Sequence, residues 1–273
     1  MAIVNRTPDS FFRPGVTWQA SAAMEHVGAA VDHGADIIDI GGVPARPGMT
    51  VEAAEEIRRT VPMVAAVREA YPDVVISVDT WRHEVAKEVC DAGADLINDS
   101  WGGWDSQLAR VTAECDAGLV CAHTGGQQPR TRPFRVAYGD VMADVLRQTV
   151  ALASRAVREG VDPSRIVIDP AHDFGKNTWH SLDVTRRLGE MTATGWPVLV
   201  SLSRKDFVGE ALGLPTDERL TGTLAATAVC AWLGAREPGL GHPGSEPLLP
   251  RQIPAPRRPV SVLDVLRHLS SVS

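Results

Sequence analysis

The sequence predicts an α/β fold of the (β/α)8 barrel class, on the grounds of chain length, strand type and an internal repeat. The 273 residues are close to the roughly 250 typical of a single barrel. The predicted strands are short apolar runs, such as Ile37-Ile-Asp-Ile40, which are typical of parallel strands covered on both faces. The phrase Gly34-Ala-Asp-Ile-Ile-Asp39 returns as Gly93-Ala-Asp-Leu-Ile-Asn98, as expected of a cyclic array of βα units.

In the first part of the chain, strands and helices alternate regularly. Apolar runs predict the strands, and apolar residues at helical spacing predict the helices between them. Gly34 follows the first helix as a stop signal. In chain order the predicted elements are a strand at 2–4, a helix at 21–33, a strand at 37–40, a helix at 51–70, a strand at 74–78, a helix at 84–91 and a strand at 94–98.

The second part continues this alternation but ends irregularly. The predicted elements are a helix at 108–115, a strand at 119–122, a long polar insert at 124–138, a helix at 141–158, a strand at 166–169, a helix at 182–191, a strand at 198–201 and a helix at 220–233. These bring the number of predicted strands to seven. Residues 236–259 are dense in proline and glycine, so only 260–265 could supply an eighth. We therefore expect a barrel domain at 1–235 and a divergent tail at 236–273.

Charge and composition favour a small-molecule ligand. The formal charge of −7 and the isoelectric point near 5.6 give no electrostatic case for binding nucleic acid or an anionic membrane. The four cysteines lack Cys-x-x-Cys spacing, which predicts reduced thiols and a cytoplasmic protein. No apolar run reaches the roughly 18 residues of a membrane span, so we expect a soluble, unanchored chain.

Polar residues stand at the carboxyl end of each of the seven predicted strands. A barrel of parallel strands gathers these ends on one face, where active sites lie. Any single aspartate there could merely cap the next helix, but capping does not explain amide, carboxylate, imidazole and ammonium groups at all seven ends. The set comprises Asn5, Asp39, Asp79, Asn98, His123, Asp169 and Ser203-Arg204-Lys205.

Three of these residues predict a pocket for a flat heterocycle. Aspartate only accepts hydrogen bonds, whereas asparagine also donates. Asp79, Asn98 and Asp169 together could therefore bind a ring that carries amino and oxo groups, with Lys205 adding a cation. The sequence has no Ser-His-Asp order, nucleophile elbow, zinc spacing or dinucleotide fingerprint.

Loop arginines offer a second type of binding. Arg46, Arg130, Arg132 and Arg135 could pair with a phosphorylated leaving group, because guanidinium groups bind phosphate bidentately. A solvated basic loop explains the same residues equally well, so both interpretations stay open.

Six motifs in one order resemble those of dihydropteroate synthase. They span about residues 2–235, and several motifs in a fixed order are far more specific than any one of them. The resemblance implies a TIM-barrel transferase of folate biosynthesis, which joins 6-hydroxymethyl-7,8-dihydropterin diphosphate to 4-aminobenzoate. The motifs are Asn5-Arg-Thr-Pro-Asp-Ser-Phe11, Gly34-Ala-Asp-Ile-Ile-Asp-Ile-Gly-Gly42 with Arg46-Pro-Gly48, Ser77-Val-Asp-Thr80, Ile97-Asn-Asp99, Asp169-Pro170 with Phe174-Gly-Lys176, and Ser203-Arg-Lys205.

The resemblance also implies roles for individual residues in the pterin pocket. Asp79, Asn98, Asp169 and Lys205 would hold the pterin, which agrees with the hydrogen-bonding argument above. Asp79, Asp169 and Lys205 would be the catalytic groups. No protein nucleophile is needed, because diphosphate leaves, the pterin ring stabilises the developing cation and the arylamine attacks. Catalysis would rest on positioning and on charge stabilisation.

Outside the pterin pocket, the resemblance assigns the other substrate contacts. Asn5 would ligate Mg²⁺, a hard cation that prefers oxygen ligands. Arg46 would contact the diphosphate, and Phe174 and Ser203 would flank the aminobenzoate together with Lys205. Homodimerisation through the outer helices is a further expectation.

The chain departs from the family pattern on the diphosphate side. Val43, Pro44 and Ala45 replace Glu-Ser-Thr, Arg6 replaces a small apolar residue, and Asp173 replaces a glycine before Phe174. The family carries Arg-x-His in the last strand to bind diphosphate. If that strand is 260–265, serine and leucine occupy the Arg and His slots.

These departures leave competing hypotheses. The first is an active dihydropteroate synthase, and the alternative is a paralogue that binds pterin but has lost or altered the transfer step. A third is another pterin-binding barrel, such as a corrinoid methyltransferase domain that uses methyltetrahydrofolate. Ser203-Arg-Lys205 and Phe174-Gly-Lys176 argue against that one. A purely structural protein would have no need of polar residues at seven strand ends.

Overall fold

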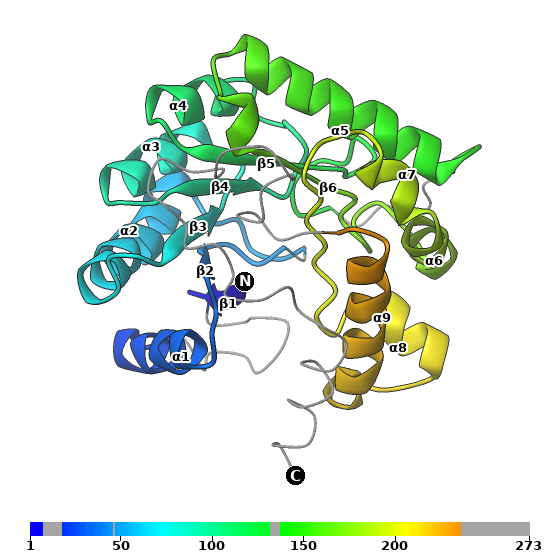
Figure 1. Cartoon of the computed structure of the whole chain (residues 1–273). Helices are drawn as coiled ribbons and strands as arrows, with labels where there is room; N and C mark the ends of the chain where they lie inside the picture. The colour runs from blue at the N-terminus through cyan, green and yellow to red at the C-terminus, as the bar shows by residue number, and fades with distance from the viewer. Residues whose placement is uncertain (8–17, 46, 132–136, 236–273) are drawn as a thin grey trace.

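The structure, a computed structural model, describes residues 1–7, 18–45, 47–131 and 137–235. In this part of the chain, six parallel strands form one sheet in chain order, each paired with the next. The helices that connect them lie around the outside of the sheet (Figure 1). The strands are β1 (Ala2–Asn5), β2 (Ile37–Gly41), β3 (Val75–Asp79), β4 (Leu96–Asp99), β5 (Gly118–Ala122) and β6 (Ile166–Asp169).

Nine α-helices accompany these strands in the described residues. Those between consecutive strands begin and end within about two residues of the positions predicted by apolar periodicity. The helices are α1 (Ala20–Asp32), α2 (Ala53–Ala70), α3 (His83–Asp91), α4 (Leu108–Glu114), α5 (Val141–Arg158), α6 (Thr178–Arg186), α7 (Leu188–Thr192), α8 (Asp206–Leu212) and α9 (Leu220–Trp232). None of them is long and apolar enough to span a membrane.

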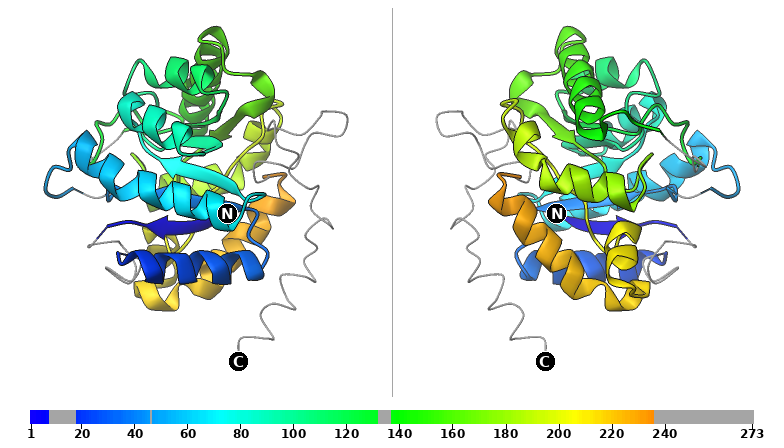
Figure 2. Two further views of the ribbon diagram at one scale, coloured as in Figure 1. Left: turned by 90° about the vertical axis from the view of Figure 1, so that its left-hand side faces the viewer. Right: turned by 90° about the vertical axis from the view of Figure 1, so that its right-hand side faces the viewer.

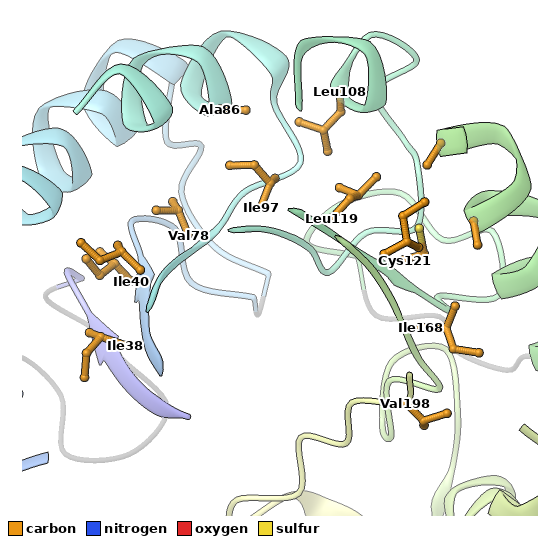
Figure 3. Close-up of a cluster of buried hydrophobic side chains, with 14 of the residues drawn as sticks. Ile38, Ile40, Val78, Ala86, Ile97, Leu108, Leu119, Cys121, Ile168 and Val198 are labelled. Carbon is orange, nitrogen blue, oxygen red and sulfur yellow. The ribbon is translucent and has the colours of Figure 1, made fainter. Parts of the chain in front are cut away.

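Strand alternation sorts side chains into an outer and an inner set. Ile38 and Ile40 of β2 point outward and belong to the same buried cluster as Val78 of β3 and Ile97 of β4, which packs against the helices (Figure 3). Fully burying such a side chain contributes about 1.5–3 kcal/mol. Because successive residues of a strand face opposite sides, Asp39 lies on the inner face. The outward apolar set therefore anchors the polar inner wall.

The strand predicted at 198–201 is wrong in length, because only one residue of it pairs with the sheet. Only a single bridge forms there, between Ile168 and Val198. The Ile168 N–H donates to Pro197 O at 2.9 Å, and the Leu199 N–H donates to Ile168 O at 3.0 Å. Pro197 has no N–H of its own to extend the ladder. The predicted eighth strand at 260–265 and the tail at 236–273 lie outside the described residues.

The helix predicted at 182–191 is two helices, α6 and α7. Helix α6 begins earlier, because the Asn177 side chain accepts a hydrogen bond from the His180 N–H at 2.9 Å in a capping box. Helix α8 was not predicted; it begins immediately after Lys205 and packs beside α6 and α9. Figure 2 shows helices α6, α8 and α9 from two sides. The position of α8 matters because it sets the direction of the Lys205 backbone.

Candidate functional site

The inner wall of the sheet, defined here as Asp39, Asp79, Asn98 and Asp169, contains the residues that were predicted to bind a heterocycle. Register pairs Asp79 with Asn98 on adjacent strands. The Asn98 Nδ2 donates to Asp39 Oδ1 at 3.3 Å, and the Ser77 hydroxyl donates to the same oxygen at 2.6 Å. Asp169 shares the inner face because it alternates with outward-facing Ile168. The structure thus brings together strand-end residues that are far apart in the chain.

The Asp79 carboxyl has a raised pKa. Burial, and then the charge of Asp39, raise the pKa of Asp79 to about 8. The Ser100 hydroxyl donates to Asp79 Oδ1 at 2.7 Å and partly offsets that rise. Burying several carboxyl groups together costs free energy unless hydrogen-bond donors satisfy them. The inner wall is therefore suited to a ligand that supplies several N–H groups.

Lys205 reaches the same region from the loop before α8. Its ammonium group donates to His172 O at 2.6 Å and lies 5.1 Å from the ring centroid of Phe174. Burial raises the pKa of Asp169, and the charge of Lys205 opposes that rise. Burial also lowers the pKa of Lys205, and the charge of Asp169 opposes this by raising it. Lys205 therefore links the inner wall to the half-buried aromatic face of Phe174.

His123 does not join the inner wall, contrary to the expectation for the strand ends. One residue beyond inward-facing Ala122, its side chain points outward and contacts Asp144 Oδ2 through Nε2 at 2.9 Å. Its Nδ1 contacts the Lys176 ammonium at 2.7 Å. Burial and the charge of Lys176 lower the pKa of His123 to about 4. His123 is thus a neutral imidazole between the sheet and helix α5, which accepts from Lys176 through Nδ1 and donates to Asp144 through Nε2.

Sequence reasoning gave Lys176 no role, although it organises the loop after β6. Its buried ammonium donates to the carbonyl oxygens of Ala171, Phe174 and His123 at 3.1, 3.0 and 3.2 Å. Burial lowers the pKa of Lys176 to about 7. Trp101, itself buried, packs edge-on against Phe174 with centroids 5.4 Å apart. Only the Phe-Gly-Lys motif could have indicated this loop in advance.

The remaining predicted site residues lie at the rim, in the loops that follow the strands. Asn5 ends β1, and a Cβ at Gly41 would lie 3.2 Å from its Oδ1, so the glycine allows the Asn5 amide to pack closely against β2. Ser203 is exposed. Arg130 uses its guanidinium on backbone oxygens, including Pro44 O at 3.1 Å. Arg46, Arg132 and Arg135 lie outside the described residues.

The described residues contain no group of three or more histidine, cysteine, aspartate or glutamate side chains placed to bind a metal ion. A magnesium ion in an enzyme commonly takes one or two protein oxygens and fills its shell with phosphate and water. The amide oxygen of Asn5, which lies against Gly41, is a ligand of the type that this pattern uses. All four cysteines are free, as predicted.

Comparisons with known proteins agree with this geometry. Residues 1–237 match the family model for pterin binding enzymes. The chain is 58% identical over 240 residues to inactive dihydropteroate synthase 2 of Mycobacterium leprae, covering 86% of this chain and 82% of that protein. It is 38% identical over 231 residues to dihydropteroate synthase of Bacillus subtilis, covering 84% and 78%.

A solved structure extends the similarity to three dimensions. The Thermus thermophilus dihydropteroate synthase, in complex with 4-aminobenzoate, superimposes with a TM-score of 0.77 at 37% identity and covers 86% of this chain and 85% of that one. The α/β barrel class predicted from sequence is confirmed by this likeness and by the parallel order of the described strands.

Proposed function

The chain belongs to the pterin-binding enzyme family, and we propose that it is a dihydropteroate synthase paralogue that binds a dihydropterin but has lost or altered the transfer to 4-aminobenzoate. The sequence alone offers such a paralogue as the alternative to an active synthase. It is favoured now because the relative at 58% identity is described as inactive, while the relatives described as synthases are at 37% and 38%.

The observation that supports pterin binding is the set of acceptors on the inner wall. Asp79 and Asp169 would accept hydrogen bonds from ring and amino N–H groups, and Asn98 could both donate and accept. The raised pKa of Asp79 means that its proton must leave before it accepts two donors. Lys205 would hold the ring or an attached anion from the Phe174 side.

Loss of transfer is supported by the diphosphate side. Val43, Pro44 and Ala45 provide no hydroxyl or carboxylate there. If 260–265 is the last strand, serine and leucine take the slots of Arg-x-His. Arg130, a candidate replacement, spends hydrogen bonds on Pro44 O and Met49 O. With fewer cations at the leaving group than the family pattern provides, the charge that develops as diphosphate departs is less well stabilised.

The remaining assignments are part of the same proposal. Asn5 would hold Mg²⁺ through its amide oxygen, and the ion would neutralise diphosphate charge when bound. Arg46 would contact the diphosphate, and Phe174 and Ser203 would flank an arylamine. We further propose a cytoplasmic homodimer; the free cysteines are compatible with a reducing compartment.

The proposal is tested by calorimetric titration of 6-hydroxymethylpterin and its diphosphate into the protein and two variants. Lys205→Ala should abolish measurable binding of both ligands, because it removes the cation between the inner wall and Phe174. Arg46→Ala should spare the free pterin and weaken the diphosphate by about tenfold, the effect of about one charge-assisted hydrogen bond. Equal losses of pterin affinity in the two variants would contradict this division of roles.

A further inference from the structure

The carboxylate of Asp173 lies within the electrostatic reach of Lys205, whose ammonium lies 5.1 Å from the centroid of the Phe174 ring, and both of its oxygens accept hydrogen bonds. Asp173 directly precedes Phe174, and its Oδ2 accepts a hydrogen bond from the Phe207 N–H at 3.3 Å. The Ser181 hydroxyl donates to its Oδ1 at 3.2 Å. The Asp173 N–H in turn donates to that hydroxyl at 3.1 Å. The carboxylate therefore has a fixed position between α6 and the first turn of α8.

The loop that carries Asp173 cannot easily move it away. Ala171, Asp173 and Gly175 adopt left-handed backbone conformations, with φ of 47°, 68° and 59°. Such values are uncommon for residues other than glycine and persist only where surrounding contacts impose them. Lys176 supplies such contacts by donating to the carbonyl oxygens of Ala171 and Phe174. A ligand placed against Phe174 thus meets a rigid loop.

The charges around Phe174 are not balanced by Lys205. Its charge acts on two carboxyl groups: burial raises the pKa of both Asp169 and Asp173, and Lys205 offsets part of each rise. The same ammonium already donates to His172 O at 2.6 Å. The nearby ammonium of Lys176 is turned to backbone carbonyls and His123. The charge of Lys176 also acts on Asp169 and Asp173, but burial lowers the pKa of Lys176 to about 7, so it offsets their charge only in part. A carboxylate on the ligand would add negative charge where Lys205 already acts on two carboxyl groups.

We infer that the surface beside Phe174 selects an uncharged arylamine over an anionic one, with Asp173 as the residue that determines this specificity. A like-charge contact in a partly desolvated site is a means of rejecting a ligand of otherwise suitable shape. The inference rests on the proposed function, because the aryl ring would bind beside an occupied pterin pocket.

The test uses two probes that differ by one charge, 4-aminobenzoate and 4-aminobenzamide. The protein is first titrated with 6-hydroxymethylpterin and then, at saturation, with each probe in low salt. We expect 4-aminobenzamide to bind about tenfold more tightly or better, because like-charge contacts cost at least that factor. Absence of pterin binding in the first titration would overturn the proposed function itself. If the protein binds pterin but binds 4-aminobenzoate as tightly as 4-aminobenzamide or more tightly, only the inference is overturned. The same holds if it binds pterin and neither probe.

Two variants assign the preference to Asp173. Asp173→Asn keeps an oxygen acceptor and removes the charge, and asparagine tolerates the left-handed conformation. Asp173→Gly removes the side chain altogether and suits φ of 68°. In each variant the affinities for 4-aminobenzamide and 4-aminobenzoate should differ by no more than about threefold. The change should come from tighter binding of 4-aminobenzoate. A ratio that stays at the parent value in either folded variant would contradict the role of Asp173.

Discussion

The inner wall and the rim loops differ in what holds their polar groups. Asp39, Asp79 and Asn98 sit on neighbouring strands, where register and the outward apolar set determine their spacing. In the described residues, the rim loops after β2 and β6 depend on local contacts such as those of Arg130 and Lys176. The wall retains the residues expected of a pterin pocket, whereas substitutions collect in the loops. A barrel can therefore change its reaction while its recognition surface, which is part of the sheet, persists.

The largest expected effect tests the inner wall directly. Asp79→Asn replaces an acceptor by a group of almost equal size that directs an N–H at the ligand. We expect pterin affinity to fall by about 10- to 100-fold, the range for a lost hydrogen bond to a charged group. Calorimetry would measure it, with Asp36→Asn as a matched substitution at a position without a proposed role. A loss below about threefold would mean that the wall is not the pterin site.

The same variant should be more stable than the parent near pH 8. The folded pKa of Asp79 is about 8, above its value of about 3.9 in an unfolded chain. Between these values the folded state retains a proton that the unfolded state has lost, so stability falls as pH rises from about 4 to 8 and then levels off.

Asp79→Asn removes this dependence and should gain more than about 1 kcal/mol at pH 8, since one pKa unit corresponds to about 1.4 kcal/mol. Urea unfolding at pH 5 and pH 8 would measure the difference. Parallel pH profiles for the two proteins would contradict the raised pKa and show that the wall is solvated. A gain in stability together with a loss of binding would identify Asp79 as a residue kept for its ligand.

The smallest effect concerns a rim contact. Arg130→Ala removes the hydrogen bonds to Pro44 O and Met49 O that join two loops. We expect a loss of about 1 kcal/mol in the free energy of unfolding and pterin affinity within about threefold of the parent. Arg130→Lys, which keeps the charge but not the fork of donors, serves as the control. A large loss of pterin affinity in Arg130→Ala would contradict the claim that the inner wall binds pterin independently of the rim loops.

The sequence allowed more of the wall than of the rim to be predicted. Asp79, Asn98 and Asp169 could be placed together because parallel strands end on one face, and the motifs agreed. His123 was misplaced because one further residue along a strand reverses the direction of a side chain. Helix α8 was missed because seven residues give little periodicity. The fixed carboxylate of Asp173 depends on contacts from α6 and α8, which no local pattern reveals.

The central claim, pterin recognition without synthase chemistry, is tested most directly by one experiment on the purified protein. Dihydropterin diphosphate, 4-aminobenzoate and Mg²⁺ are supplied together, dihydropteroate is measured, and the pterin is titrated in parallel. The account predicts saturable pterin binding with no dihydropteroate above the uncatalysed background. Turnover well above that background would contradict it and show that other groups stabilise the departing diphosphate.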